Sequence, residues 1–202
     1  MFRLIKITFN AVLLVLAIIG FNAIGGQKYV EIAKYNVTKY LHERAEESAK
    51  KFGNFSNLHE EFEIDSTVNL FGYRAVLAEH NATGQKMCIV DSKKKPLLTQ
   101  DDIKSPNLEK QLQALADKFK YQAVSFHEIK VVDRGTIKIY SQTVPYAKFE
   151  AKANKLPFSD LGGIVASVTT SDGSEKLAIS LNEKKKYSQL IAEEFYKNIT
   201  EK

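Results

Sequence analysis

The pattern of hydrophobic and polar residues changes along this chain, and the first change comes within its opening 25 residues. No residue from Ile7 to Ile24 is charged, and the charged residues before this stretch are Arg3 and Lys6. An apolar stretch with cations at its amino end inserts into membranes and leaves that end in the cytoplasm. We therefore predict that residues 1–25 are a membrane-insertion signal and that the following domain lies outside, in a periplasmic or extracellular compartment.

Two alternatives for this signal stay open. The uncharged stretch, residues 7–24, is 18 residues long, which is about the minimum that spans ~30 Å of hydrocarbon at ~1.5 Å per helical residue. A retained stretch would anchor the protein in the membrane as a single-pass helix. Ala23 and Gly25 are small residues of the kind found at a signal-peptide cleavage site. Cleavage near Gly25 would release a secreted or periplasmic protein.

Residues 27–52 have the period of one long amphipathic helix. Charged side chains cover most of its surface, and Gly53-Asn54 supplies a stop signal. One stripe stays apolar at spacings of three and four residues, and it consists of Val30, Ala33, Val37, Leu41, Ala45, Ala49 and Phe52. We expect this stripe to pack against the rest of the domain.

Beyond this helix the period changes to two, which is typical of half-buried strands. Residues 62–70 alternate between apolar and polar side chains, and residues 81–84 read as a hairpin turn between the next two strands. Residues 133–135, Asp-Arg-Gly, and residues 171–174, Ser-Asp-Gly-Ser, mark two further turns. The predicted strands are 62–70, 73–79, 86–90, 123–132, 136–143, 146–153, 163–170 and 176–181.

Two more segments return to a helical period. Ser105-Pro106 is a favourable start for one of them, because serine caps helices and proline suits their first turn. Its apolar stripe consists of Leu108, Leu112, Leu115 and Phe119. The last helix begins near Lys184, and its predicted apolar side consists of Tyr187, Leu190, Ile191, Phe195 and Ile199.

Helices and strands are segregated along the chain, and most links between strands are short. This order favours the α+β class, in which helices cover an antiparallel sheet. The predicted fold is a membrane-inserting N-terminal helix, a long amphipathic helix packed on an antiparallel β-sheet, and two further helices. A cystatin-like or NTF2-like shape is compatible with it.

Residues 27–202 are long enough for a single exported domain with its own core. A faint internal repeat relates the segment that follows Gly84 to the segment that follows Gly173, because each glycine precedes a strand and then a lysine triplet. If the repeat is a true duplication, the domain divides into two sub-lobes, 27–104 and 105–202, which could share a sheet.

Charge and cysteine content narrow the candidate partners. The formal net charge is +5, and loss of Arg3 and Lys6 with residues 1–25 leaves +3. The remaining charges are interspersed instead of forming a basic stripe, so we predict no nucleic-acid partner. Cys88 is the single cysteine, which excludes an intramolecular disulfide. Its apolar neighbours predict a small buried side chain instead of a reactive thiol.

The sequence contains no convincing catalytic, cofactor-binding or metal-binding motif, and we assign no residue to such a site. The four histidines lack metal-ligand spacing. The chain is therefore more typical of a binding protein than of an enzyme. An enzyme remains the alternative, with a hydrolase-type or ligand-binding site assembled from distant residues. A tyrosine with His127, Glu128 and Asp133 could then transfer protons.

The first quarter of the chain resembles type IV pilins and pseudopilins in outline. Phe2-Arg3-Leu4-Ile5-Lys6 opens an apolar helix that would continue into an amphipathic half and an antiparallel sheet. In pilins a longer leader precedes this phenylalanine and a glutamate follows it, whereas here Met1 precedes Phe2 and Lys6 is basic. The resemblance implies a filament subunit as a further alternative.

From these patterns we expect a membrane-anchored or exported protein of the cell envelope that acts by binding. Its expected partners are the membrane, through residues 7–24 if they are not cleaved, and an unidentified protein or small ligand. No cofactor is predicted.

Overall fold

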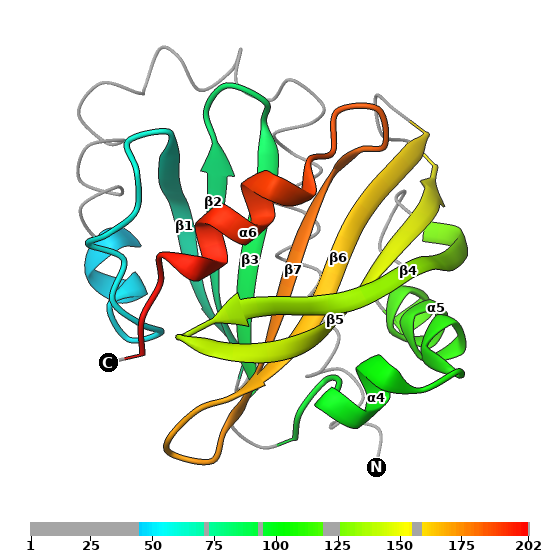
Figure 1. Cartoon of the computed structure of the whole chain (residues 1–202), viewed down its shortest axis with the longest axis horizontal. Coiled ribbons are helices and arrows are strands. Elements are labelled where there is room, and N and C mark those ends of the chain that lie inside the picture. The colour runs from blue at the N-terminus through cyan, green and yellow to red at the C-terminus, as the bar shows by residue number, and fades with distance from the viewer. Residues whose placement is uncertain (1–44, 71–72, 93–94, 119–125, 155–158, 202) are drawn as a thin grey trace.

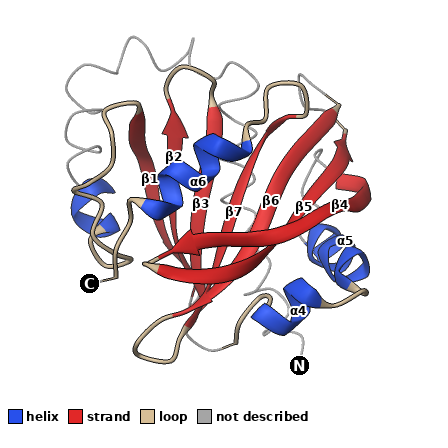
Figure 2. Ribbon diagram, in the orientation of Figure 1, coloured by secondary structure: helices blue, strands red, loops and turns tan. Residues whose placement is uncertain are grey.

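The computed structural model describes residues 45–70, 73–92, 95–118, 126–154 and 159–201. These residues form one seven-stranded antiparallel sheet with short helices on both faces, as Figures 1 and 2 show. The strand order is β1-β2-β3-β7-β6-β5-β4. The predicted α+β class and the antiparallel sheet are therefore confirmed. The predicted membrane segment and residues 27–44 lie outside the described residues.

The sheet joins strands from both halves of the chain, because β3 pairs with β7 in its centre. Whether the two halves arose by duplication stays a prediction. The strands are β1 (Phe62–Leu70), β2 (Tyr73–His80), β3 (Gln85–Ser92), β4 (Phe126–Ile139), β5 (Gln142–Ala153), β6 (Asp160–Thr169) and β7 (Glu175–Glu183).

Two of the predicted turns are confirmed and one is wrong. The β2–β3 and β6–β7 hairpins turn where expected, with Gly84 and Gly173 at φ angles of +67° and +78° that favour glycine. The chain does not turn at residues 133–135, because β4 runs through them. Gly135 is needed there for another reason, since a Cβ atom would lie 2.8 Å from the ring of Tyr146 on β5.

The β4–β5 hairpin instead turns at Tyr140 and Ser141, whose φ angles are +51° and +63°. Neither residue is a glycine or asparagine, the residues that usually adopt the two positive φ angles of such a turn. The local sequence therefore does not predict a turn here. Tertiary contacts hold Tyr140 in place, because its side chain is buried and its hydroxyl donates to the Phe52 carbonyl at 2.7 Å.

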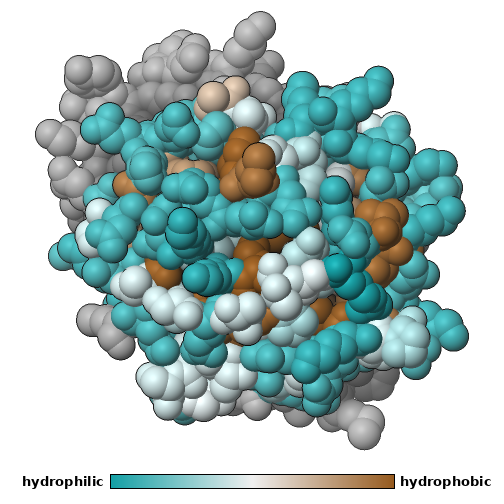
Figure 3. Space-filling model, in the orientation of Figure 1, coloured by the Kyte–Doolittle hydropathy of each residue, from teal (hydrophilic) through white to brown (hydrophobic). Residues whose placement is uncertain are grey.

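The front face of the sheet is covered by α6 (Gln189–Lys197), which runs diagonally across the central strands in Figure 1. Phe195 and Tyr196 are buried beneath it, with ring centroids 5.1 Å apart in an edge-on arrangement. The Tyr196 hydroxyl donates to the carbonyls of Ile179 at 2.7 Å and Cys88 at 3.1 Å. The outer surface on this side is mainly hydrophilic, with scattered hydrophobic residues (Figure 3).

Residues 45–52 also belong to the front core. Residues 45–49 are helical, and Ala45, Ala49 and Phe52, the last three positions of the predicted stripe, are buried. At Gly53 a Cβ atom would lie 2.8 Å from the Thr200 carbonyl oxygen, so the chain passes too close to its C-terminal segment for a larger residue. Asn54 and Thr200 then exchange two backbone hydrogen bonds, at 2.8 and 3.2 Å.

A row of charges crosses the front face beneath Phe52. Arg74, Asp91 and Lys176 are neighbours in the register of β2, β3 and β7, and Arg74 forms an ion pair with the buried Asp91. The Lys176 ammonium donates to the Phe52 carbonyl at 3.2 Å and lies 5.0 Å from the ring centroid of Tyr140. Burial lowers the pKa of Lys176, and nearby Asp91 opposes this shift. The row fixes residues 45–52 to the sheet.

The back face carries α4 (Gln100–Lys104) and α5 (Leu108–Lys118). The helix predicted from Ser105 begins at Leu108, because α4 ends at Ser105 first. Thr99 caps α4 in a capping box with Asp102, whose side chain also accepts from Gln111 on α5. Within the described part of the chain, α4 packs against β5 and β6 and α5 packs against β4.

The helix predicted from about Lys184 begins at Gln189, so Tyr187 and Ile199 lie just outside α6. The predicted apolar residues are buried or partly buried except Leu190, which is 76% exposed. We expect Phe195→Ala to lower the free energy of unfolding by about 3–5 kcal/mol, because it empties the centre of the front core. Leu190→Ala is the matched control and should change it by less than about 0.5 kcal/mol. Denaturant unfolding of the two variants measures both values, and equal losses would contradict this packing.

Candidate binding cavity

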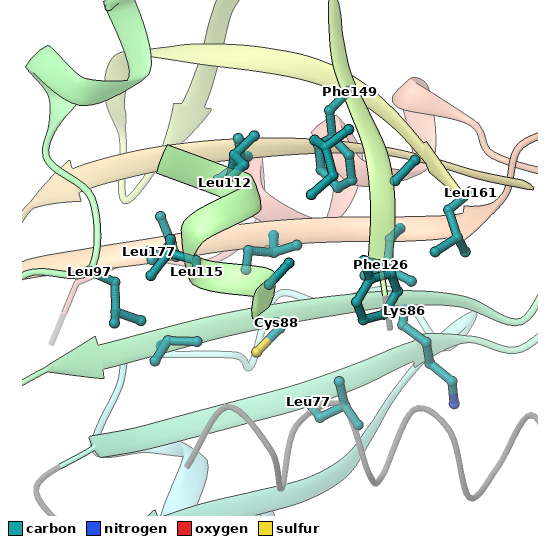
Figure 4. A pocket seen from close by; sticks show the side chains of 17 residues that line it. Leu77, Lys86, Cys88, Leu97, Leu112, Leu115, Phe126, Phe149, Leu161 and Leu177 are labelled. Atoms are coloured by element: carbon teal, nitrogen blue, oxygen red, sulfur yellow. The ribbon is translucent and has the colours of Figure 1, made fainter. Parts of the chain in front are cut away.

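A cavity of about 140 Å³ lies between α5 and the back face of the sheet (Figure 4). Strands from both halves of the sheet and the first strand residues after α5 contribute to its wall. The described residues that line it are Leu77, Lys86, Cys88, Val90, Leu97, Leu112, Leu115, Ala116, Phe126, Ile129, Phe149, Ala151, Leu161, Val165, Leu177, Ile179 and Leu181.

The wall follows directly from the two periodicities of the sequence. Cys88 and Val90 alternate with front-face residues on β3, and Leu177, Ile179 and Leu181 do the same on β7, so they all face the back. On α5, Leu112, Leu115 and Ala116 have the spacing of one helix face. Small side chains at Cys88, Ala116 and Ala151 leave the space between helix and sheet unfilled.

Lys86 carries the only charge among the described lining residues, and its charge is directed elsewhere. Its ammonium forms an ion pair with Glu79, which lies directly across from it on β2, and lies 3.9 Å from Asp65. In Figure 4 the Lys86 nitrogen points away from the labelled leucines, so the cavity is lined by its aliphatic stem. The cavity therefore presents carbon and one thiol.

Such a cavity can hold an apolar group and has little to offer a polar one. Its volume of about 140 Å³ is close to the ~150 Å³ that accommodates benzene in an engineered protein cavity. The Cys88 thiol is 3% exposed, and burial raises its pKa to about 12. It is thus a poor nucleophile at neutral pH, and the prediction of a small buried side chain is confirmed.

The residues considered for proton transfer lie along the edge strand β4. Glu128 forms an ion pair with Lys152 at 2.8 Å, where both side chains are about half exposed. The hydrogen bond from Lys152 lowers the pKa of Glu128. Asp133 accepts from the backbone of Arg134 at 2.8 Å, and His127 faces Lys152 in the register. None of these three acidic or imidazole groups is among the described residues that line the cavity.

Two other histidines make local contacts and are not among the described residues that line the cavity. His59 lies 3.3 Å from Glu194, and His80 lies 3.0 Å from the Thr83 hydroxyl and 3.4 Å from Glu61. Across the described ranges, no group of three or more His, Cys, Asp or Glu side chains is arranged to hold a metal ion. No helix within these ranges is long and apolar enough to cross a membrane, and residues 7–24 fall outside them.

A second hollow lies beside β1 and has a mixed lining. It measures about 520 Å³ and includes Glu46, Lys50, His59 and Glu63 together with Phe55 and Phe62. Acidic, basic and apolar side chains are interspersed around it, so its lining does not indicate one class of ligand.

Sequence reasoning placed most of the cavity-lining residues on strands or on one amphipathic helix but did not predict the cavity between them. The alternation on each strand and the stripe on α5 are visible in the sequence, whereas the gap depends on side-chain volumes across elements distant in the chain. Comparison with known proteins adds no relative, because no family model matches the chain and no curated protein matches it significantly.

Because Cys88 is the single cysteine, its alkylation reports directly on this wall. We expect iodoacetamide at pH 8 to react with the native full-length chain at least 100-fold more slowly than with the chain in denaturant, since the native thiol is buried and its pKa is about 12. Mass spectrometry over time gives both rates. Rapid stoichiometric labelling of the native protein would show that the thiol is accessible.

Proposed function

We propose that this chain is a membrane-anchored or exported cell-envelope protein that acts by binding, and that it holds an apolar group in the cavity beneath α5. The observation that carries this proposal is the lining of the cavity, in which Lys86 turns its charge outward and the other described residues are apolar. Burial of apolar surface stabilises such a complex by roughly 25 cal/mol per Å² before the cost of association.

Binding is favoured over catalysis by the groups available around this space. General acids and bases need a pKa near the working pH and a position within reach of the substrate. The Cys88 thiol has its pKa raised to about 12, and Lys86 is occupied by Glu79. An apolar ligand would therefore be held without being activated.

We further propose that the predicted helix 27–52 packs on the sheet along its whole apolar stripe. Ala45, Ala49 and Phe52 of this stripe are buried in the front core. The rest of the stripe, which includes Leu41, would extend the same buried face.

In this arrangement residues 7–24 either anchor the domain to the membrane or are removed near Gly25. The N-terminus would remain cytoplasmic in the first case, and the sheet domain would stand outside in both. The mass of the mature protein distinguishes the two forms.

If the long helix packs on the sheet, Leu41→Asp should unfold the domain or lower its melting temperature by about 10 °C or more. The change removes about 1.5–3 kcal/mol of side-chain burial and buries a carboxylate. Lys39→Asp, on the opposite side of the predicted helix, should leave the melting temperature nearly unchanged. Thermal unfolding by circular dichroism tests the pair, and an unchanged melting temperature for Leu41→Asp would rule out this packing.

Ligand binding in the cavity is tested with toluene, an apolar probe of suitable size. At a concentration tenfold above its dissociation constant it should stabilise the full-length chain by about 1.4 kcal/mol, seen as a rise in melting temperature. Ala116→Leu places three more carbon atoms in the cavity and should abolish the rise. Ala114→Leu makes the same change on the exposed side of α5 and should preserve it.

The proposal fails if toluene does not stabilise the unmodified chain. It also fails if the rise is the same in both variants, since the ligand would then bind elsewhere. Melting curves of both variants without toluene confirm that each is folded.

A further inference from the structure

We propose that α5 is a hinged lid over the apolar cavity and that its second half swings away from the sheet to admit the ligand. This inference rests on the proposed binding function and names the route by which the ligand enters. The described lining residues all lie on strands, except Leu97 and three residues of α5, Leu112, Leu115 and Ala116. Because backbone hydrogen bonds tie the strands into one sheet, α5 is the part of the wall that moves most readily.

The sheet side of the cavity is nearly closed to solvent. Cys88, Val165 and Leu177 line it and are 3%, 1% and 5% exposed. The Cys88 thiol lies below the α5 ribbon in the view of Figure 4. A molecule larger than water therefore makes full contact with these residues only when part of the wall moves.

The start of α5 is its fixed end. Leu108, the first residue of the helix, is completely buried. Arg134 on β4 donates to the Ser105 carbonyl, just before the helix, at 2.9 Å. Gln111 donates to the Asp102 carboxylate of α4 at 2.6 Å. A movement of α5 would therefore pivot about this end.

Two side chains of α5 latch the helix to the edge strand β4. Gln113 donates to the Phe126 carbonyl at 3.0 Å, and Glu109 accepts from the Val131 backbone at 2.8 Å. The three cavity-lining side chains of α5 are only partly buried, because the cavity leaves them few atoms to contact. One hydrogen bond changes an equilibrium constant by about fivefold, so this latch can open while the sheet stays folded.

Cys88 provides the test, because it is the single cysteine and lies under the lid. The full-length chain is held in phosphatidylcholine nanodiscs, and mass spectrometry follows its alkylation by iodoacetamide at increasing urea concentrations. A local opening exposes less surface than unfolding does. We therefore expect the alkylation rate at low urea to rise with less than half the slope that global unfolding gives. A rate that follows global unfolding at every urea concentration would overturn the lid.

The latch is tested by Gln113→Ala, which removes the bond to the Phe126 carbonyl. This variant should raise the alkylation rate at low urea about fivefold. Lys110→Ala is the matched control, because Lys110 is an exposed residue of the same helix, and it should change the rate by less than about twofold. An unchanged rate in a folded Gln113→Ala variant would overturn the role of the latch.

Toluene connects the lid to the binding function. At a free concentration tenfold above its dissociation constant, fixed through the vapour phase, it should slow the alkylation at low urea about tenfold, because it binds under the closed lid. If toluene stabilises the chain against heat but leaves this rate unchanged, the opening does not admit the ligand, and the lid inference is wrong while binding stands. If toluene neither slows alkylation nor stabilises the chain, the proposed function is wrong, and the urea dependence alone decides whether α5 opens.

Discussion

The need to bury both faces of β3 organises this domain. All eight residues of this strand are buried, and it pairs with β2 on one side and β7 on the other. A strand covered on both faces requires a layer above and a layer below, because each face exposes apolar side chains at every second residue. On the front, α6 supplies this layer, and Tyr196 ties the helix to the sheet by donating to carbonyls of β3 and β7.

The two layers are packed differently, and the difference explains where the cavity lies. Phe195 and Tyr196 fill the front with rings that contact one another and, through Phe195, the ring of Phe62 on β1. The back has side chains of smaller volume at Cys88 and Ala151, while α5 is displaced toward the β4 edge of the sheet. An offset helix above small residues cannot reach native packing density, so a cavity is the expected consequence.

Sequence patterns were sufficient for the elements whose local and tertiary preferences agree. The β2–β3 and β6–β7 hairpins have glycines where the turn needs them, and the strand period gives the correct inward residues. At Tyr140 and Ser141 the two preferences conflict. Positive φ angles there cost about 1–2 kcal/mol per residue, and burial of the Tyr140 ring with its hydrogen bond to Phe52 offsets that cost. No local pattern encodes such a compensation.

Gly135 shows the opposite case, in which a familiar turn signal has another cause. Asp133-Arg134-Gly135 resembles a turn, but its glycine admits the ring of Tyr146 from the neighbouring strand. The direction of the Lys86 ammonium was hidden for the same reason. It depends on Glu79, seven residues earlier in the chain, being directly opposite in the register. The chemistry of the candidate site therefore depends on which strands pair and in which register, and a single sequence does not specify this pairing.

A chain with one cysteine cannot form an intramolecular disulfide, so other contacts must join the first and last segments of its described part. The backbone bridge between Asn54 and Thr200, together with the bonds from Tyr140 and Lys176 to the Phe52 carbonyl, joins the first described segment to the last. The single thiol lies inside the back layer, where it cannot form an intermolecular disulfide in an oxidising compartment.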